Sequence, residues 1–251
     1  MSSAAISLIV FVCVSAGSLL GMSLRRSLPE RHFIEDSKET VKLGMGFVST
    51  MSALVLGLLV SSAKSFYDTQ SAEVNQLSAD IVALDRLLDH YGPETKEARE
   101  ALRSTVMSVI ERIWNRDPVR SREAPASERS AETLLDKVQA LVPQNEKQRL
   151  LQGQAVNLVI GIGRIRWLMY EQSNASVSQT LLTVMVFWLT VVFTSFGLFA
   201  PRNATAVVSL LAAGLSVSGA IFLICDMYVP YRGLVQISSA PLRSALAHLG
   251  Q

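Results

Sequence analysis

Cysteine and histidine are scarce in this chain of 251 residues, which has two cysteines and three histidines. Cys13 and Cys225 lie in apolar stretches, where a thiol behaves as a small hydrophobic group. His32, His90 and His248 are scattered and lack the helical-pair or cysteine-pair spacing of a metal site. We therefore expect no metal site and no cofactor.

The chain also lacks the short motifs of the common enzyme classes. It has no glycine-rich phosphate loop, no nucleophile elbow, no His-Glu pair at helical spacing and no carboxylate pair within an apolar stretch. Its formal net charge is only +2, and no long block of like charge could bind a polyanion. We expect a protein that is not an enzyme and has no nucleic-acid partner.

Charged residues are absent from four long windows, residues 4–24, 43–63, 177–200 and 204–225. A helix rises about 1.5 Å per residue, so about 20 apolar residues cross the hydrocarbon core of a bilayer. The first window could instead be a signal peptide, but no Lys or Arg precedes it and its charges follow it. The sequence therefore predicts four membrane helices, the last two joined by a tight turn at Pro201–Asn203.

Small residues recur at helical spacing in three of these windows, a pattern that lets helices approach closely. Two readings are open: packing within one bundle, or a contact between subunits or a pore wall. The positions are Gly17 and Gly21 in the first window, Gly46, Ala53 and Gly57 in the second, and Ala212, Ser216 and Ala220 in the fourth.

The insert between the second and third windows, residues 64–176, is polar but keeps an apolar rhythm of three and four residues. One such seam follows the second window, interrupted by Gln70, and another leads into the third. Two seams of this kind are typical of an antiparallel coiled-coil stalk. Their residues are Tyr67, Val74, Leu77, Ile81, Leu84, Leu88 and Tyr91, then Leu151, Ala155, Leu158, Ile162, Ile165 and Met169.

The predicted fold is therefore all-α, with four membrane helices, an extramembrane helical stalk in the insert and a tail at residues 226–251. Gly92 and Pro93 end the first stalk helix, a second runs through Trp114, and Val119–Ser130 is predicted to be a loop. We expect the second and third membrane helices to continue unbroken into the stalk. Interleaved charges on the two stalk helices are expected to form acidic and basic faces that attract one another, namely Asp80, Asp85, Arg86 and Asp89 on the first and Lys147, Arg149, Arg164 and Arg166 on the second.

The last part of the chain resembles a known family. Residues 226–238, DMYVPYRGLVQIS, with Pro241 and Leu242 beyond them, resemble the C-terminal signature of the bestrophin-like domain family of bacterial membrane proteins. The second window from Leu54 to Ser62, and its run into Glu73 and Asn75, resemble the same family. Tyr231 stands where the family usually has Phe, and the proline expected at the start of the third window is missing around Asn174 to Ser178.

The resemblance implies an architecture and a function. Bestrophins are pentameric anion channels with cytoplasmic termini, a pore lined by the second membrane helix and an acidic-to-Pro-Phe segment after the fourth. We therefore expect a homo-oligomer in the bacterial inner membrane, with termini and insert in the cytoplasm, although basic residues near the windows do not decide the orientation. The pore-lining stripe would be Gly46, Ser49, Ala53, Leu56 and Val60, and the family motif Asp226, Pro230, Tyr231, Arg232 and Gly233.

Two functions are compatible with these features. The first is an oligomeric ion channel, whose uncharged spans could gate by dewetting at an apolar constriction. The second is a non-catalytic membrane scaffold or signalling partner that uses the stalk and the loop Val119–Ser130 as a docking surface. Asp226 is expected to be an interfacial anchor beside Tyr228 and Tyr231, with a gate or ion contact as the alternative.

Overall fold

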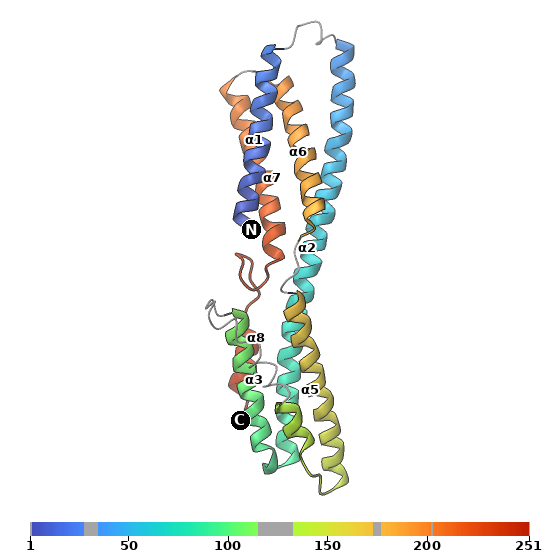
Figure 1. Ribbon diagram of the computed structural model, residues 1–251, viewed down its shortest axis with the longest axis vertical. Helices are drawn as coiled ribbons and strands as arrows, with labels where there is room; N and C mark the ends of the chain where they lie inside the picture. The colour runs from blue at the N-terminus through green and yellow to red at the C-terminus, as the bar shows by residue number, and fades with distance from the viewer. Residues whose placement is uncertain (1, 28–34, 115–132, 173–176, 202, 251) are drawn as a thin grey trace. The chain divides into compact units, whose positions relative to one another are not determined.

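The computed structural model describes residues 2–27, 35–114, 133–172, 177–201 and 203–250. These residues form two compact units (Figure 1). The first, here the membrane unit, comprises Met1–Tyr67 and Ser176–Val229, and the second, here the stalk unit, comprises Asp68–Ala175 and Pro230–Gln251. The helices include α1 (Ser3–Ser27), α2 (Glu35–Tyr91), η2 (Pro93–Thr95), α3 (Lys96–Trp114), α5 (Glu146–Gln172), α6 (Gln179–Phe199), α7 (Ala204–Met227) and α8 (Ala240–His248), and residues 133–139 are helical as well.

The predicted all-α class and the four candidate membrane helices are confirmed. Four helices of the described chain are long and apolar enough to cross a membrane: α1, α2, α6 and α7. No strand occurs among the described residues.

Glycines bring α1 into close contact with α6 inside the membrane unit. A Cβ on Gly21 would overlap the carbonyl oxygen of Thr194, and one on Gly197 would overlap the carbonyl oxygen of Ser18. A Cβ on Gly17 would lie 3.0 Å from the carbonyl oxygen of Thr190. For the first window, the reading of small residues as packing within one bundle is therefore correct.

The two helices that flank the turn at Pro201 pack mainly against α1 and touch one another little. Ser7 on α1 donates through Oγ to the carbonyl of Ser218 on α7 at 2.9 Å, and Ser218 Oγ donates back to the Ser7 carbonyl at 2.8 Å. At the other end of α1, Arg25 Nη1 donates to the Ala200 carbonyl at 2.7 Å, just past α6. Reciprocal bonds and glycine contacts together make α1, α6 and α7 one packed group.

The second membrane helix continues into the stalk as predicted, because α2 is a single helix of 57 residues. It begins at Glu35, eight residues before the predicted window 43–63, so residues 35–42 are helical as well. The same expectation is wrong for the third membrane helix. There α5 ends at Gln172 and α6 begins at Gln179, with Val177 and Ser178 outside any helix. The helix is thus interrupted before the third membrane helix, although the proline that the family resemblance implies at this point is missing.

The stalk unit is built on the predicted seam of α2. Val74, Leu77, Ile81, Leu84 and Leu88 are at most 2% exposed. An antiparallel partner is supplied by α5, whose first turn contacts the end of α2 and whose last turn contacts its middle. The bonds that show this are Gln148 Nε2 to the Tyr91 carbonyl at 3.0 Å and Gln172 Nε2 to Glu73 Oε1 at 3.4 Å.

Helix α3 and the C-terminal segment complete the stalk unit. Gly92 has φ of 137°, a conformation that favours glycine, and it separates α2 from η2 and α3. Arg99 on α3 donates to Asp85 through Nε and Nη2 at 2.8 and 3.0 Å and to Asp89 through Nη1 at 2.9 Å. Asp85 and Asp89 thus pair with α3. The expectation that they face the basic residues of α5 is wrong. The predicted loop Val119–Ser130 lies outside the described residues.

Candidate functional site

The predicted pore-lining stripe lies on the least covered of the membrane helices. Within the single chain, 11% of the apolar window of α2 is buried, against 33% for α6 and 28% for α1. Ser52, Leu59 and Ala63 are buried, and Leu59 and Ala63 belong to the hydrophobic core of the membrane unit. The predicted stripe lies on a different side of α2. In this stripe Gly46, Ala53 and Val60 are exposed, while Ser49 and Leu56 are half-buried.

The glycines of α2 differ from those of α1 in what they contact. A Cβ on Gly46 or Gly57 would meet no other atom within 4 Å. Close approach of another helix is the usual reason for small residues on a membrane helix. For the second window, the described part of this chain supplies no such neighbour to the glycines, so packing within one bundle does not explain them.

A second exposed stripe on α2 is bulky and apolar. Phe47 is 69% exposed, Leu54 60% and Leu58 67%. These side chains and the small residues occupy different sectors of the same helix, because neighbours in sequence are about 100° apart around an α-helix. The exposed surface of α2 therefore has two sectors. One carries bulky apolar side chains and is suited to lipid or a neighbouring chain. The other, here the small sector, carries mainly small side chains, both polar and apolar.

The structure divides the family motif between the two units. Asp226, at the end of α7, is 4% exposed, and its backbone carbonyl accepts from Val229 N–H at 3.0 Å. Tyr228 stacks on Phe66, with ring centroids 5.0 Å apart, and its hydroxyl lies 3.2 Å from Ser62 Oγ. These contacts fasten the end of α7 to α2 within the membrane unit.

The rest of the motif belongs to the stalk unit, where Tyr231 is buried and Arg232 is exposed. The Tyr231 hydroxyl donates to Gln70 Oε1 at 2.6 Å. Its ring meets the Trp114 ring edge-on, with centroids 5.3 Å apart. Trp114 Nε1 donates to the Ile237 carbonyl at 2.8 Å, and Ile237 N–H donates to the Pro230 carbonyl at 2.7 Å. The motif thus connects α2 and α3 to the C-terminal segment.

Beside Tyr231 lies a cluster of polar side chains, the buried Gln70 and the half-buried Glu73 and Gln172, with unused hydrogen-bonding groups. Gln70 Nε2, Glu73 Oε2 and Gln172 Oε1 are all buried without a partner among the described residues. Burial raises the pKa of the Glu73 carboxyl, and the bond from Gln172 offsets this only in part. Burial, together with the Glu73 carboxylate, also raises the pKa of the Tyr231 phenol. The surroundings of Glu73 therefore disfavour its charged form relative to a carboxyl group in water.

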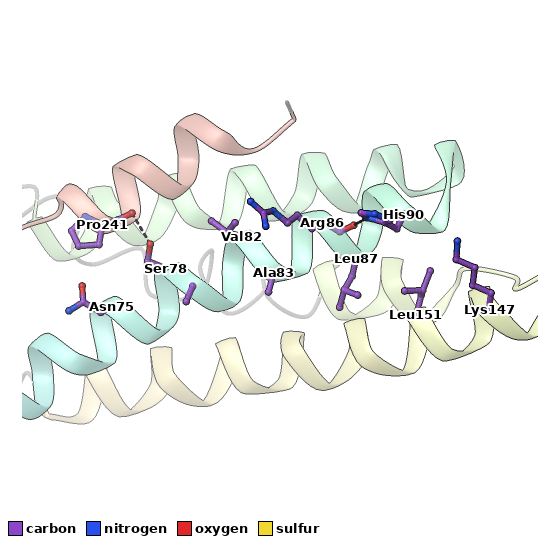
Figure 2. A pocket seen from close by; sticks show the side chains of 11 residues that line it. Asn75, Ser78, Val82, Ala83, Arg86, Leu87, His90, Lys147, Leu151 and Pro241 are labelled. Atoms are coloured by element: carbon purple, nitrogen blue, oxygen red, sulfur yellow. Dashed lines mark hydrogen bonds between the residues drawn. The ribbon is translucent and has the colours of Figure 1, made fainter.

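An open groove of ≈ 840 Å³ runs along the stalk part of α2 (Figure 2). Its floor is mainly apolar, and its two full cations are Arg86 on α2 and Lys147 on α5. The Ser78 hydroxyl donates to the Pro241 carbonyl at 2.8 Å, which holds the start of α8 at one end of the groove. The remaining lining residues are Asn75, Ala79, Val82, Ala83, Leu87, His90 and Leu151.

Sequence reasoning missed the groove and the buried cluster. Gln70 was visible only as an interruption of the apolar seam, and that interruption was the one signal of a buried polar contact. Among the described residues, no group of three or more His, Cys, Asp or Glu side chains is placed to hold a metal ion.

Comparison with known proteins gives the family. Residues 12–242 match the bestrophin-like domain. The chain belongs to the bestrophin-like domain family. It is a membrane protein of that family, with four candidate membrane helices. No curated protein sequence matches the chain.

Solved structures share the fold of this family member over nearly its whole length. Two mutant structures of a bacterial bestrophin homologue from Klebsiella pneumoniae each have a TM-score of 0.72 and 11% identity. One alignment covers 96% of this chain and 97% of that chain, and the other 98% and 99%. A third structure, of a mutant membrane protein, has a TM-score of 0.69 at 11% identity and covers 98% and 99%. The fold is therefore bestrophin-like.

Proposed function

We propose that the chain is a subunit of a homo-oligomeric ion channel in the bacterial inner membrane, with α2 of each copy lining the pore. The observation that carries the proposal is the exposure of Gly46, Ala53 and Gly57 on one side of α2, where a Cβ added to either glycine would meet no other atom of the described residues within 4 Å. Membership of the bestrophin-like family supports it, because bestrophins are the pentameric anion channels that the sequence resembles. By the same likeness, we propose a pentamer with its termini and insert in the cytoplasm.

The proposed pore wall is Gly46, Ser49, Ala53, Leu56 and Val60, the stripe predicted from the sequence. No Asp, Glu, Lys or Arg occurs between residues 43 and 63, so charged rings do not select the ion in this segment. Apolar side chains can close a narrow pore by excluding water from it. Leu56 and Val60, the two largest members of the stripe, are the proposed gate, and the permeant ion is proposed to be an anion.

Recording across planar bilayers with purified protein tests this function. Wild-type protein is expected to give discrete conductance steps, with a reversal potential that follows the chloride gradient in asymmetric salt. Val60→Ser is expected to raise the open probability, because a polar side chain wets the constriction. Leu58→Ser on the bulky sector is the matched control and is expected to leave gating unchanged.

Each outcome bears on a separate part of the proposal. Absence of conductance at both polarities would overturn the channel assignment. A reversal potential that followed the cation gradient would overturn the choice of anion alone. Equal effects of the two serine variants would contradict the assignment of Val60 to the pore wall.

A further inference from the structure

The contact between Glu73 on α2 and Gln172 on α5 leaves one oxygen atom of each side chain unused. Gln172 Nε2 donates to Glu73 Oε1 at 3.4 Å. Glu73 Oε2 and Gln172 Oε1 are both buried and have no partner among the described residues. Two helices of the stalk unit are therefore joined here by one hydrogen bond, although the two groups have atoms for two.

Both unused oxygens are hydrogen-bond acceptors while Glu73 is ionised. A carboxylate has no donor, and the carbonyl oxygen of an amide only accepts. Gln70 Nε2, one turn away on α2, also lacks a partner among the described residues, so it donates to neither oxygen. Buried acceptors without a donor destabilise the folded state. The ionised pair therefore lacks one donor.

Protonation of Glu73 supplies that donor. A neutral carboxyl has one O–H donor and one acceptor oxygen, and a primary amide has N–H donors and a carbonyl acceptor. In both groups the unused oxygen is attached to the same Cδ as the atom that already forms the bond, so the groups are complementary over two bonds. We propose that Glu73 and Gln172 form a proton-binding site, in which the protonated Oε2 of Glu73 donates to Gln172 Oε1 as the second bond.

Burial, and not neighbouring charge, controls proton uptake at this site. The pKa of Glu73 is raised by burial and lowered in part by the bond from Gln172. Tyr231, the titratable group that the C-terminal segment places beside Glu73, has a raised pKa and stays neutral at ordinary pH. The charged side chains nearest along α2, α5 and the C-terminal segment, with one that α3 places over the Tyr170 ring, are Asp68, Asp80, Arg166, Glu171, Arg232 and Arg112.

The proton strengthens the stalk unit at one defined point. Because the pKa of Glu73 is higher in the folded state, the stabilisation by the proton is fully present below the ordinary value of 4.5 and is lost as the pH rises through the folded-state pKa. Gln172 is the last residue of α5, and the membrane helix α6 begins at Gln179. Acidification therefore tightens the hold of α2 on the end of α5. This inference does not rest on the proposed function, since the pair requires no ion conduction.

Amide hydrogen exchange in the last turn of α5, followed by mass spectrometry on the full chain in detergent, tests the site. Glu73→Gln replaces the acid O–H by a permanent N–H donor. Near neutral pH we expect this turn to exchange about two- to tenfold more slowly in Glu73→Gln than in wild type, the range for one net hydrogen bond. Below the ordinary pKa we expect the two proteins to exchange alike.

The matched control is Glu171→Gln, which removes the same charge from the exposed residue next to Gln172. It is expected to exchange like wild type at both pH values, each comparison being made at one pH so that the intrinsic exchange rate cancels. An effect of Glu73→Gln that is equal at both pH values, or absent at both, would overturn the proton-binding site.

Urea unfolding near neutral pH separates the second bond from the removal of charge alone. Gln172→Met keeps the length of the side chain and removes both of its polar atoms. If the second bond forms, Glu73→Gln raises the free energy of unfolding more in wild type than in Gln172→Met. If only charge matters, the order is reversed, because Gln172→Met takes away the donor to the carboxylate. Equal gains, or the reversed order, would overturn the proposal.

Discussion

Replacing Tyr231 by Phe removes one oxygen atom from the motif that joins the C-terminal segment to α2. That oxygen donates to Gln70 Oε1 at 2.6 Å, and the Gln70 side chain is fully buried. The ring of residue 231 would keep its edge contact with Trp114. The variant therefore isolates the hydrogen bond from the packing.

The expected loss of stability follows from the polar atoms of Gln70 that the variant leaves without a hydrogen-bond partner. Its Nε2 already lacks a partner among the described residues, so Tyr231→Phe leaves both ends of a buried amide unsatisfied. A buried polar group that loses its partner costs about 1–3 kcal/mol. For a chain of this size, each 1 kcal/mol corresponds to roughly 2–4 °C in the melting temperature, so a drop of about 2–12 °C is expected.

The decisive comparison adds Gln70→Leu, which fills the interruption in the apolar seam of α2. Gln70→Leu alone leaves the Tyr231 hydroxyl buried and unpaired. The double variant Gln70→Leu with Tyr231→Phe removes every polar atom of the pair, and such a replacement is nearly neutral or stabilising.

Melting of the detergent-solubilised protein, followed by circular dichroism, gives all four values of this double-mutant cycle. We expect Tyr231→Phe to melt below wild type and the double variant to melt at or above wild type. A Tyr231→Phe melting temperature equal to that of wild type, or a double variant less stable than Tyr231→Phe, would refute the reasoning.

Three further predictions concern stability. Burial raises the pKa of the Glu73 carboxyl above 4.5, so the folded state disfavours its charged form. Glu73→Gln should therefore raise the free energy of unfolding near neutral pH. Urea unfolding should show that this gain vanishes below the ordinary pKa of the carboxyl, where Glu73 is neutral in both states. Gly197→Ala places a Cβ on a carbonyl oxygen of α1 and should lower the melting temperature, whereas Gly57→Ala meets open space within the chain and should not lower it in monomeric protein. Arg99→Ala removes both bonds to the buried carboxylate of Asp85 and should lower the free energy of unfolding, measured in urea, by about 2–3 kcal/mol. An unchanged free energy of unfolding would contradict the pairing.

The seam of α2 was predictable because burial on one side of a helix imposes an apolar period on the sequence. Leu77, Leu84 and Leu88 are buried where that period places them. The interruption at Gln70 was equally visible. Its partner was not, because Tyr231 lies 161 positions along the chain and no local pattern links the two.

Other features depend on tertiary contacts that spacing does not encode. Gly17 and Gly57 belong to similar patterns of small residues. Gly17 contacts α6 closely, whereas a Cβ on Gly57 would meet no described atom within 4 Å. The acidic residues of α2 were matched to α5 by charge alone, whereas Arg99 reaches Asp85 because Gly92 turns α3 back along α2. The break between α5 and α6 was missed because an apolar window records hydropathy and carries no information on backbone angles.

The central claim, that the small sector of α2 faces an ion pathway, is tested most directly by thiol modification during recording. Ala53→Cys and its neighbour Leu54→Cys are compared in a background of Cys13→Ser and Cys225→Ala, with a water-soluble methanethiosulfonate reagent applied to open channels. We predict that the current through Ala53→Cys channels is blocked irreversibly while that through Leu54→Cys channels is unaffected. Block at Leu54→Cys with none at Ala53→Cys would contradict the claim.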